Sequence, residues 1–167
     1  MQGRIIKMGN DIDTDQIIPS QHLLTTIEDM KRYTFETLYP DFCDRVQTCN
    51  IIVAGDNFGC GSSREQAPTV LRALGVQAVI AKSFARIFFR NAINIGLTVI
   101  ICGEIQNEVK DGQLIEVNAK AGKITTDAGI GFSCTALPVH MSEILEAGGL
   151  IEYLNKRTSA THGNDNQ

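Results

Sequence analysis

The sequence has no excess of basic residues: 15 Lys and Arg stand against 19 Asp and Glu, and like charges do not gather in runs. Binding to nucleic acid or to a membrane surface usually requires a basic patch or stripe. We therefore expect no nucleic acid and no membrane among the partners. A small anionic ligand would have to be attracted by a local group of charges.

Long apolar runs are also missing. The most apolar stretch, residues 76–102, is interrupted by Lys82, Arg86 and Arg90, whereas a membrane-spanning helix needs roughly 20 apolar residues. The first residues, Met1 to Arg4, lead into a mixed segment without the apolar core of a secretory signal. The sequence thus predicts a soluble protein in the cytoplasm.

The sequence also lacks a metal-binding pattern. The five cysteines show neither Cys-x-x-Cys spacing nor a disulfide pattern, and their odd number favours free thiols. His22 and His140 have no companion at metal-ligand spacing. We expect no metal, and no iron–sulfur cluster, to be held by this chain. Cys60 stands apart because a glycine lies on each side of it.

Short apolar runs alternate with helical patterns in most of the chain, which is long enough for one domain. Strands are expected at 3–8, 50–54, 77–81 and 97–102, and later at about 114–117, 123–126 and 131–135. The fold class is α/β, with a mixed sheet flanked by helices in a single domain, residues 1–156. After Gly148 and Gly149 we expect a short last helix and a polar, disordered tail, residues 157–167.

The helix patterns carry several local signals. Ser63 with Gln66 predicts a capping box, although Pro68 requires a short or bent helix or a start nearer the proline. Ser83 is expected to cap a helix from Phe84 to Ile95, which would place Lys82, Arg86 and Arg90 along one side. Thr25 or Thr26 is expected to cap a helix through Leu38, and another helix is expected at 139–147.

One loop is the strongest candidate for chemistry. A buried strand leads into a Gly-rich segment, Gly55 to Gly61, and then into Ser62, Ser63 and Arg64 ahead of a helix. Free backbone N–H groups, two hydroxyls and a guanidinium at such a place suit a carboxylate or a phosphate. A Walker loop would need a lysine, and a nucleophile elbow would need Gly-x-Ser-x-Gly. Helix capping by the serines remains the structural alternative.

A second segment, Asp11-x-Asp13-x-Asp15, begins like a calcium loop. Its sixth position is Gln16 and its twelfth is His22, where a calcium loop has Gly and Glu. Asx-turn hydrogen bonds that order the next loop, together with a contact to a neighbouring arginine, are the alternative.

Three segments together resemble the small subunit of isopropylmalate isomerase in the aconitase superfamily. They are residues 13–19 (DTDQIIP), residues 55–67 (GDNFGCGSSREQA) and residues 81–88 (AKSFARIF), and the likeness continues through 91–97 and 144–150. The resemblance implies a swivelling β/β/α domain that docks on a separate large subunit holding a 4Fe-4S cluster. No cofactor is then expected on this chain.

By the same resemblance, the reaction moves a hydroxyl between neighbouring carbons of a small hydroxy di-acid, by removing water and adding it back, in leucine biosynthesis. Ser62 would take the carbon-bound proton, and Ser63 and Arg64 would bind a substrate carboxylate. An isolated subunit would be inactive.

Substrate choice is read, in the family, from the loop that contains Leu24 and Thr25. Homoaconitase-like relatives have an arginine at the position of Leu24, so an apolar residue favours an alkyl substituent. The loop departs from the isopropylmalate type at His22, where a tyrosine is expected. Methylmalate or citraconate, dimethylmalate and homoaconitate hydro-lyases stay open as alternatives, and an anion- or RNA-binding module is the rival from another class.

Overall fold

The chain folds around one mixed sheet of seven strands in the order β4-β3-β2-β1-β5-β6-β7. The structure is a computed structural model and describes residues 1–162, with side chains through Ser159. The strands are β1 (Gln2–Lys7), β2 (Ile51–Ala54), β3 (Ala78–Ala81), β4 (Thr98–Ile101), β5 (Leu114–Asn118), β6 (Lys123–Thr126) and β7 (Gly131–Ser133). Each lies within a few residues of a predicted strand, so the α/β prediction with a mixed sheet is confirmed.

Strands β1 to β4 are parallel, and β2 and β3 are buried along their whole length. Burial on both faces explains their continuous apolar sequences, because neither face is left for polar side chains. We call the edge of the sheet at which β1 to β4 end the carboxyl edge, and the opposite edge the amino edge. Loops from three neighbouring parallel strands meet at the carboxyl edge.

Strands β5 to β7 are antiparallel and bury only alternate residues. Ile115, Val117, Ile124 and Phe132 face one apolar core together with Ile5 of β1 and Ile80 of β3. The opposite face of β1 to β4 contributes to a second core, which contains Val70 and Leu71 of α4 and Phe88 of α5. Helices therefore cover one face of the parallel strands, and the antiparallel strands help to cover the other.

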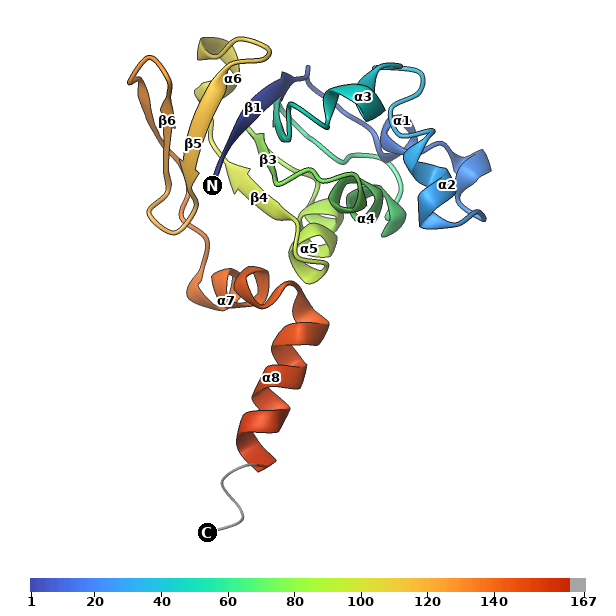
Figure 1. The fold of residues 1–167 in the computed structure, drawn as a ribbon, viewed down its shortest axis with the longest axis vertical. Helices are drawn as coiled ribbons and strands as arrows, with labels where there is room; N and C mark the ends of the chain where they lie inside the picture. Colours follow the sequence, from blue (N-terminus) through green and yellow to red (C-terminus); the bar gives the residue numbers. More distant parts are fainter. Residues whose placement is uncertain (163–167) are drawn as a thin grey trace.

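The helices are short apart from the last. They are α1 (Thr14–Ile17), the 3-10 turn η1 (Ser20–His22), α2 (Ile27–Lys31), α3 (Phe42–Arg45), α4 (Gln66–Ala73), α5 (Arg86–Asn94), α6 (Ile105–Glu108), α7 (Val139–Ala147) and α8 (Leu150–His162). Figure 1 shows α8 extending away from the rest of the chain. Gly148 has φ +96° and separates α7 from α8, as its position in the sequence predicts.

Two predicted helix starts are wrong. The residue that precedes α4 is Glu65, and neither it nor Ser63 caps the helix with a side chain. Helix α5 begins at Arg86, and the Ser83 hydroxyl accepts a hydrogen bond from the Asn57 backbone N–H at 2.8 Å instead. Lys82 consequently precedes the helix, so the predicted ladder is reduced to Arg86 and Arg90.

Other helix predictions hold in part. Pro68 is the third residue of α4. A missing N–H at this position costs no intrahelical hydrogen bond, so the predicted shift of the helix start toward the proline is confirmed. Thr26 caps α2, but the helix ends at Lys31 and does not reach Leu38. Phe35 has φ +57°, and its N–H bonds to the Ile17 carbonyl at 3.0 Å, which turns the chain out of the helix.

The C-terminal part is more regular than predicted. Helix α8 has 13 residues and continues to His162, so the first part of the predicted tail, residues 157–162, is helical. The rest of that tail, residues 163–167, lies outside the described residues. Over the part of the chain that the structure describes, no helix has the length and apolar character that crossing a membrane requires.

Candidate active site

Three loops meet at the carboxyl edge, one after each of β1, β2 and β3. The Gly59 N–H donates to the Ile12 carbonyl and the Thr14 N–H to the Cys60 carbonyl, both at 2.8 Å. On the other side, the Phe58 N–H donates to the Ser83 carbonyl at 3.0 Å. The Gly-rich loop is therefore held between the loops that flank it, so tertiary contacts fix its path.

The glycines of this loop are needed for its path. Gly59 has φ +78°, and a Cβ built there would lie 2.2 Å from the Phe88 ring. Gly61 has φ +89°, and its Cβ would lie 2.4 Å from the Asp13 carboxylate. Asn57 also has a positive φ, +59°. Glycine adopts such angles without strain, whereas a positive φ at a non-glycine residue such as Asn57 is uncommon and is often found at functional sites, where the surroundings hold it in place.

Ser62 and Ser63 follow the glycines and are exposed. Within residues 1–162, the backbone N–H groups of both serines make no hydrogen bond. Thr14 is buried; its hydroxyl donates to the Ser62 carbonyl at 3.0 Å and lies 3.4 Å from the Ser62 hydroxyl. Free backbone N–H groups beside exposed hydroxyls can receive an anion, and the capping alternative for these serines is overturned.

Arg64 lies beside the serines in a cluster of hydrogen bonds. Its guanidinium donates to the Asp15 carboxylate, to the Ile18 carbonyl at 3.1 Å and to the Ser20 hydroxyl at 2.8 Å. Ser20 in turn donates to the same Asp15 oxygen at 2.8 Å. The arginine is thereby fixed, and its remaining side-chain N–H groups make no hydrogen bond within the described residues.

Asp15 carries the negative charge of this cluster. Hydrogen bonds from Arg64 and Ser20 hold the pKa of the Asp15 carboxyl below its usual value. The predicted Asx-turn is also present, since the Asp13 carboxylate accepts from the Asp15 N–H at 2.7 Å. The predicted contact between this segment and an arginine is confirmed as the pair Asp15–Arg64.

The predicted specificity residues lie apart from the serines. Leu24 is fully exposed, and the Thr25 hydroxyl donates to the His22 carbonyl at 2.7 Å. Among the described residues, nothing joins Leu24 or Thr25 directly to Ser62, Ser63 or Arg64. The link is indirect: Ser20 contacts Arg64 and begins the turn that leads into this loop.

His22 is fixed within the specificity loop. Its ring stacks on Tyr33 with centroids 3.7 Å apart, and its Nε2 lies 3.1 Å from a Glu36 carboxylate oxygen. This residue replaces the expected tyrosine. Its contacts orient the start of the loop and leave Leu24 projecting from it.

Cys60 is built into the loop. Its backbone pairs with Asp13, and burial raises the pKa of its thiol, as do the charges of Asp13 and Asp11. A raised pKa keeps the thiol protonated, so Cys60 is a poor nucleophile. All five cysteines are free, as predicted.

Two site residues were missed by the sequence patterns. Thr14 and Ser20 are ordinary in sequence, and their contacts with Ser62 and Arg64 join residues 48 and 44 positions apart. The only signal was their place in the segment after β1. No group of three or more His, Cys, Asp or Glu side chains that could hold a metal occurs within the described residues, so they do not fit a cluster site.

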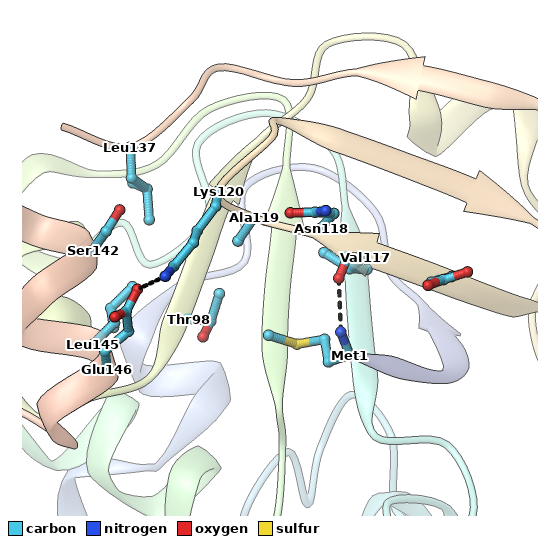
Figure 2. Close-up of a pocket in the computed structure, with 11 residues that line it drawn as sticks. Met1, Thr98, Val117, Asn118, Ala119, Lys120, Leu137, Ser142, Leu145 and Glu146 are labelled. Carbon is cyan, nitrogen blue, oxygen red and sulfur yellow. Dashed lines mark hydrogen bonds and ion pairs between the residues drawn. The ribbon is translucent and has the colours of Figure 1, made fainter. Parts of the chain in front are cut away.

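A hollow of about 470 Å³ lies at the other end of the sheet. Figure 2 shows Met1, Thr98 and Lys120 among its lining residues. Three of its ionic groups have partners: Lys120 lies 2.6 Å from Glu146, and the Met1 ammonium donates to the Val117 carbonyl at 2.8 Å. The Glu116 carboxylate, which also lines the hollow, has no side-chain partner among the described residues. Since Met1 precedes β1 and Thr98 begins β4, this hollow belongs to the amino edge.

Comparisons with known proteins identify the family of this chain. Residues 7–103 match the family model of the aconitase C-terminal domain. This span includes the Gly-rich loop, Ser62, Ser63 and Arg64, and it defines the class of domain.

Individual relatives show to which group of proteins with this domain the chain is similar. The chain is 50% identical over 155 residues to a 3-isopropylmalate dehydratase small subunit of Lachnospira eligens, covering 92% of this chain and 93% of the relative. It is 47% identical over 159 residues to an isopropylmalate/citramalate isomerase small subunit of Methanocaldococcus jannaschii, covering 94% and 95%. A crystal structure of 3-isopropylmalate dehydratase from the same archaeon superposes with a TM-score of 0.90 at 43% identity, over 97% of both chains.

The chain belongs to the family of 3-isopropylmalate dehydratase small subunits. The resemblance seen in the sequence motifs is thereby confirmed.

Proposed function

We propose that the chain is the small subunit of a hydro-lyase that interconverts 3-isopropylmalate and 2-isopropylmalate, in leucine biosynthesis, and that it acts only with a large subunit. The observation that carries this proposal is the arrangement at the carboxyl edge. Two exposed serines with free N–H groups lie next to an arginine that Asp15 and Ser20 hold in place. Cytoplasmic location stays a prediction.

Ser62 is assigned as the base that takes the carbon-bound proton. A serine hydroxyl is a very weak base, so its alkoxide must be stabilised by nearby donors and positive charge. The free N–H groups of the loop, the Arg64 guanidinium and the Thr14 hydroxyl at 3.4 Å can supply this. The exposed position of Ser62 leaves it open to a substrate.

Arg64 and Ser63 are assigned to a substrate carboxylate. An arginine presents a planar set of donors that matches a carboxylate, and a fixed arginine loses little freedom on binding. The Asp15–Arg64 pair keeps the guanidinium oriented before the substrate arrives. Ser63 adds an exposed hydroxyl next to it.

The other half of the site is assigned to the partner. Loss of the substrate hydroxyl needs a Lewis acid, which a 4Fe-4S cluster on the large subunit would supply. Every step assigned to this chain is binding, orientation or proton transfer at Ser62, Ser63 and Arg64. We expect the isolated small subunit to be inactive.

Leu24 and Thr25 are assigned to the alkyl substituent of the substrate. The full exposure of Leu24 in the free subunit leaves an apolar side chain for a substrate or partner to cover. Burying an alkyl group against leucine is favourable, and burying an unpaired carboxylate there is costly. Methylmalate or citraconate, dimethylmalate and homoaconitate remain alternatives, and the Methanocaldococcus jannaschii relative carries both isopropylmalate and citramalate in its name.

Reconstitution with the large subunit tests the proposal. The complex should be assayed with 3-isopropylmalate, citraconate and homoaconitate, and kcat/KM compared among them. We expect the isopropylmalate reaction to be fastest, and neither subunit to be active alone.

A matched variant tests the specificity residue. Leu24→Arg should lower kcat/KM for isopropylmalate by about tenfold or more, as expected for losing an apolar contact worth roughly 1–3 kcal/mol. It should also raise turnover of homoaconitate. An unchanged preference would remove Leu24 from the substrate pocket, and turnover of none of the three acids by the wild-type complex would refute the proposed function.

A further inference from the structure

A second hollow, of about 540 Å³, lies between α5, α7 and the end of β4. Its floor is apolar and is formed mainly by half-buried side chains: Phe84, Phe89, Ile101, Met141 and Ile144. We call it the α5–α7 groove. The same two helices also expose Ile87 and Val139, which are 54% and 76% accessible. Apolar surface gathered in this way is typical of a binding site for another molecule.

The rim of the groove is cationic. Arg86, Arg90 and His140 line it and are all exposed. In the described part of the chain, neither guanidinium forms an ion pair or a hydrogen bond. The guanidinium groups of Arg45 and Arg64, in contrast, are both paired with carboxylates. The chain as a whole has a net charge of −4, so this rim is a local exception. An apolar floor with a charged rim is the usual anatomy of a protein interface.

The groove adjoins the loop of the candidate active site through backbone contacts. Phe84 forms part of its floor and pairs through its backbone with Phe58 of the Gly-rich loop. The Ala85 N–H also donates to the Phe58 carbonyl at 3.0 Å. Phe58 precedes Ser62 by four residues. A large subunit that completes the site at Ser62 would lie over the carboxyl edge, where Phe84 of the groove follows β3.

We propose that the α5–α7 groove receives the large subunit, through a segment that carries apolar side chains flanked by carboxylates. The proposal rests on the proposed function, because that function requires a partner at the carboxyl edge. Apolar side chains fill the floor, and the carboxylates pair with Arg86 and Arg90. The chain's own last five residues, 163–167, are Gly, Asn, Asp, Asn and Gln, and their composition does not suit an apolar floor.

Affinity for the purified large subunit, measured by biolayer interferometry with full-length small subunits, tests this surface. The double variant Arg86→Glu/Arg90→Glu should weaken binding by about 100-fold and slow association, because it places like charges together at the rim. The charge-conserving variant Arg86→Lys/Arg90→Lys should bind within a few-fold of wild type. The matched control Arg4→Glu/Lys123→Glu makes the same change in net charge away from the groove and should bind like wild type.

Circular dichroism and thermal unfolding establish whether each variant is folded, and the lysine variant supplies a second result should the glutamate variant fail to fold. Raising the salt concentration should weaken wild-type binding more than binding of the glutamate variant. Wild-type affinity of a folded glutamate variant would overturn the proposal. So would a wild-type dimer that the variant abolishes without loss of affinity for the large subunit, because a second copy would then be the occupant.

The two proposals fail in different ways. Failure of the proposed function gives a complex of normal affinity that converts none of the hydroxy acids. Failure of the groove proposal gives an active complex whose affinity is insensitive to Arg86 and Arg90.

Discussion

The two edges of the same parallel sheet differ in what their polar groups do. At the amino edge, most ionic groups in the hollow are already paired: Lys120 with Glu146, and the Met1 ammonium with the Val117 carbonyl. At the carboxyl edge, the backbone N–H groups of Ser62 and Ser63 make no hydrogen bond within residues 1–162, both serines are exposed, and Gly59 and Gly61 before them adopt positive φ angles. Partnered groups stabilise a fold, whereas fixed but unsatisfied groups are suited to a ligand.

The largest expected effect at the carboxyl edge is that of Ser62→Ala. Positioned acid–base groups contribute roughly 10²–10⁴-fold to rate, so we expect the reconstituted enzyme to lose about 1,000-fold in kcat with little change in subunit affinity. Steady-state assays of the complex measure this. The matched change Ser142→Ala, at the amino-edge hollow, should leave kcat unchanged. Equal activity of the two variants would remove Ser62 from the role of base.

Arg64→Lys should come next. Lysine keeps the charge but loses the planar set of donors, so kcat/KM should fall by about 100-fold, as expected for losing hydrogen bonds to charged groups worth roughly 1.5–3 kcal/mol. The readout is steady-state kinetics of the reconstituted complex. Arg4→Lys, on β1 and remote from the loop, is the control and should have no effect. Wild-type kinetics for Arg64→Lys would mean that the guanidinium does not bind substrate.

Gly59→Ala tests the backbone of the loop. The new methyl group meets the Phe88 ring and the residue must keep φ +78°, so we expect a loss of about 3 kcal/mol in the free energy of unfolding. Urea unfolding of the small subunit measures it. Gly112→Ala is the matched control: it has φ +75° but open space around the new atom, and it should cost about 1 kcal/mol. Equal losses would show that the contact with Phe88 is not restrictive.

Asp15→Asn should give the smallest effect. The pair with Arg64 is partly exposed, so its removal should cost about 0.2–1 kcal/mol of stability at neutral pH. Because the folded-state pKa of Asp15 is lowered from 3.8, the pair contributes fully above that pH and its contribution is lost as the pH falls through the folded value. Urea unfolding at pH 7 and pH 3 should therefore show a difference between wild type and variant that shrinks at pH 3.

For Asp15→Asn, the KM of the reconstituted complex distinguishes the role of the carboxyl edge from that of the amino edge. Asp15→Asn should also raise KM in the reconstituted complex, because the guanidinium of Arg64 loses an orienting partner. Glu146→Gln breaks an ion pair at the amino edge whose carboxylate is as exposed as that of Asp15, and it should leave KM unchanged. A wild-type KM for Asp15→Asn would contradict the orienting role.

Much of the fold could be predicted from local patterns. Strands β2 and β3 are continuous apolar runs, and Gly148 ends α7 with a positive φ as its position predicts. Such features depend on neighbouring residues only. The capping box predicted for Ser63 and Gln66 does not form. Backbone hydrogen bonds from the flanking loops hold the Gly-rich loop, and α4 begins only at Gln66. Ser83 does not cap α5 as predicted, because residues 83–85 form hydrogen bonds with Phe58 and Asn57 instead.

The candidate site divides in the same way. Ser62, Ser63 and Arg64 are adjacent in sequence, so their proximity was predictable. The Thr14 contact and the Ser20 contact depend on how β1 and β2 align side by side, which no local pattern specifies. The exposure of Leu24 likewise depends on how its loop packs.

Hydrogen–deuterium exchange of the small subunit, alone and with its large subunit, tests the contrast between the edges most directly. We predict that complex formation protects backbone amides in residues 55–65 and 82–90 at the carboxyl edge. Amides around Met1 and residues 118–122 at the amino edge should exchange at the same rate in both states. Protection at the amino edge with none at the carboxyl edge would contradict the assignment of the carboxyl edge as the half-site that the partner completes.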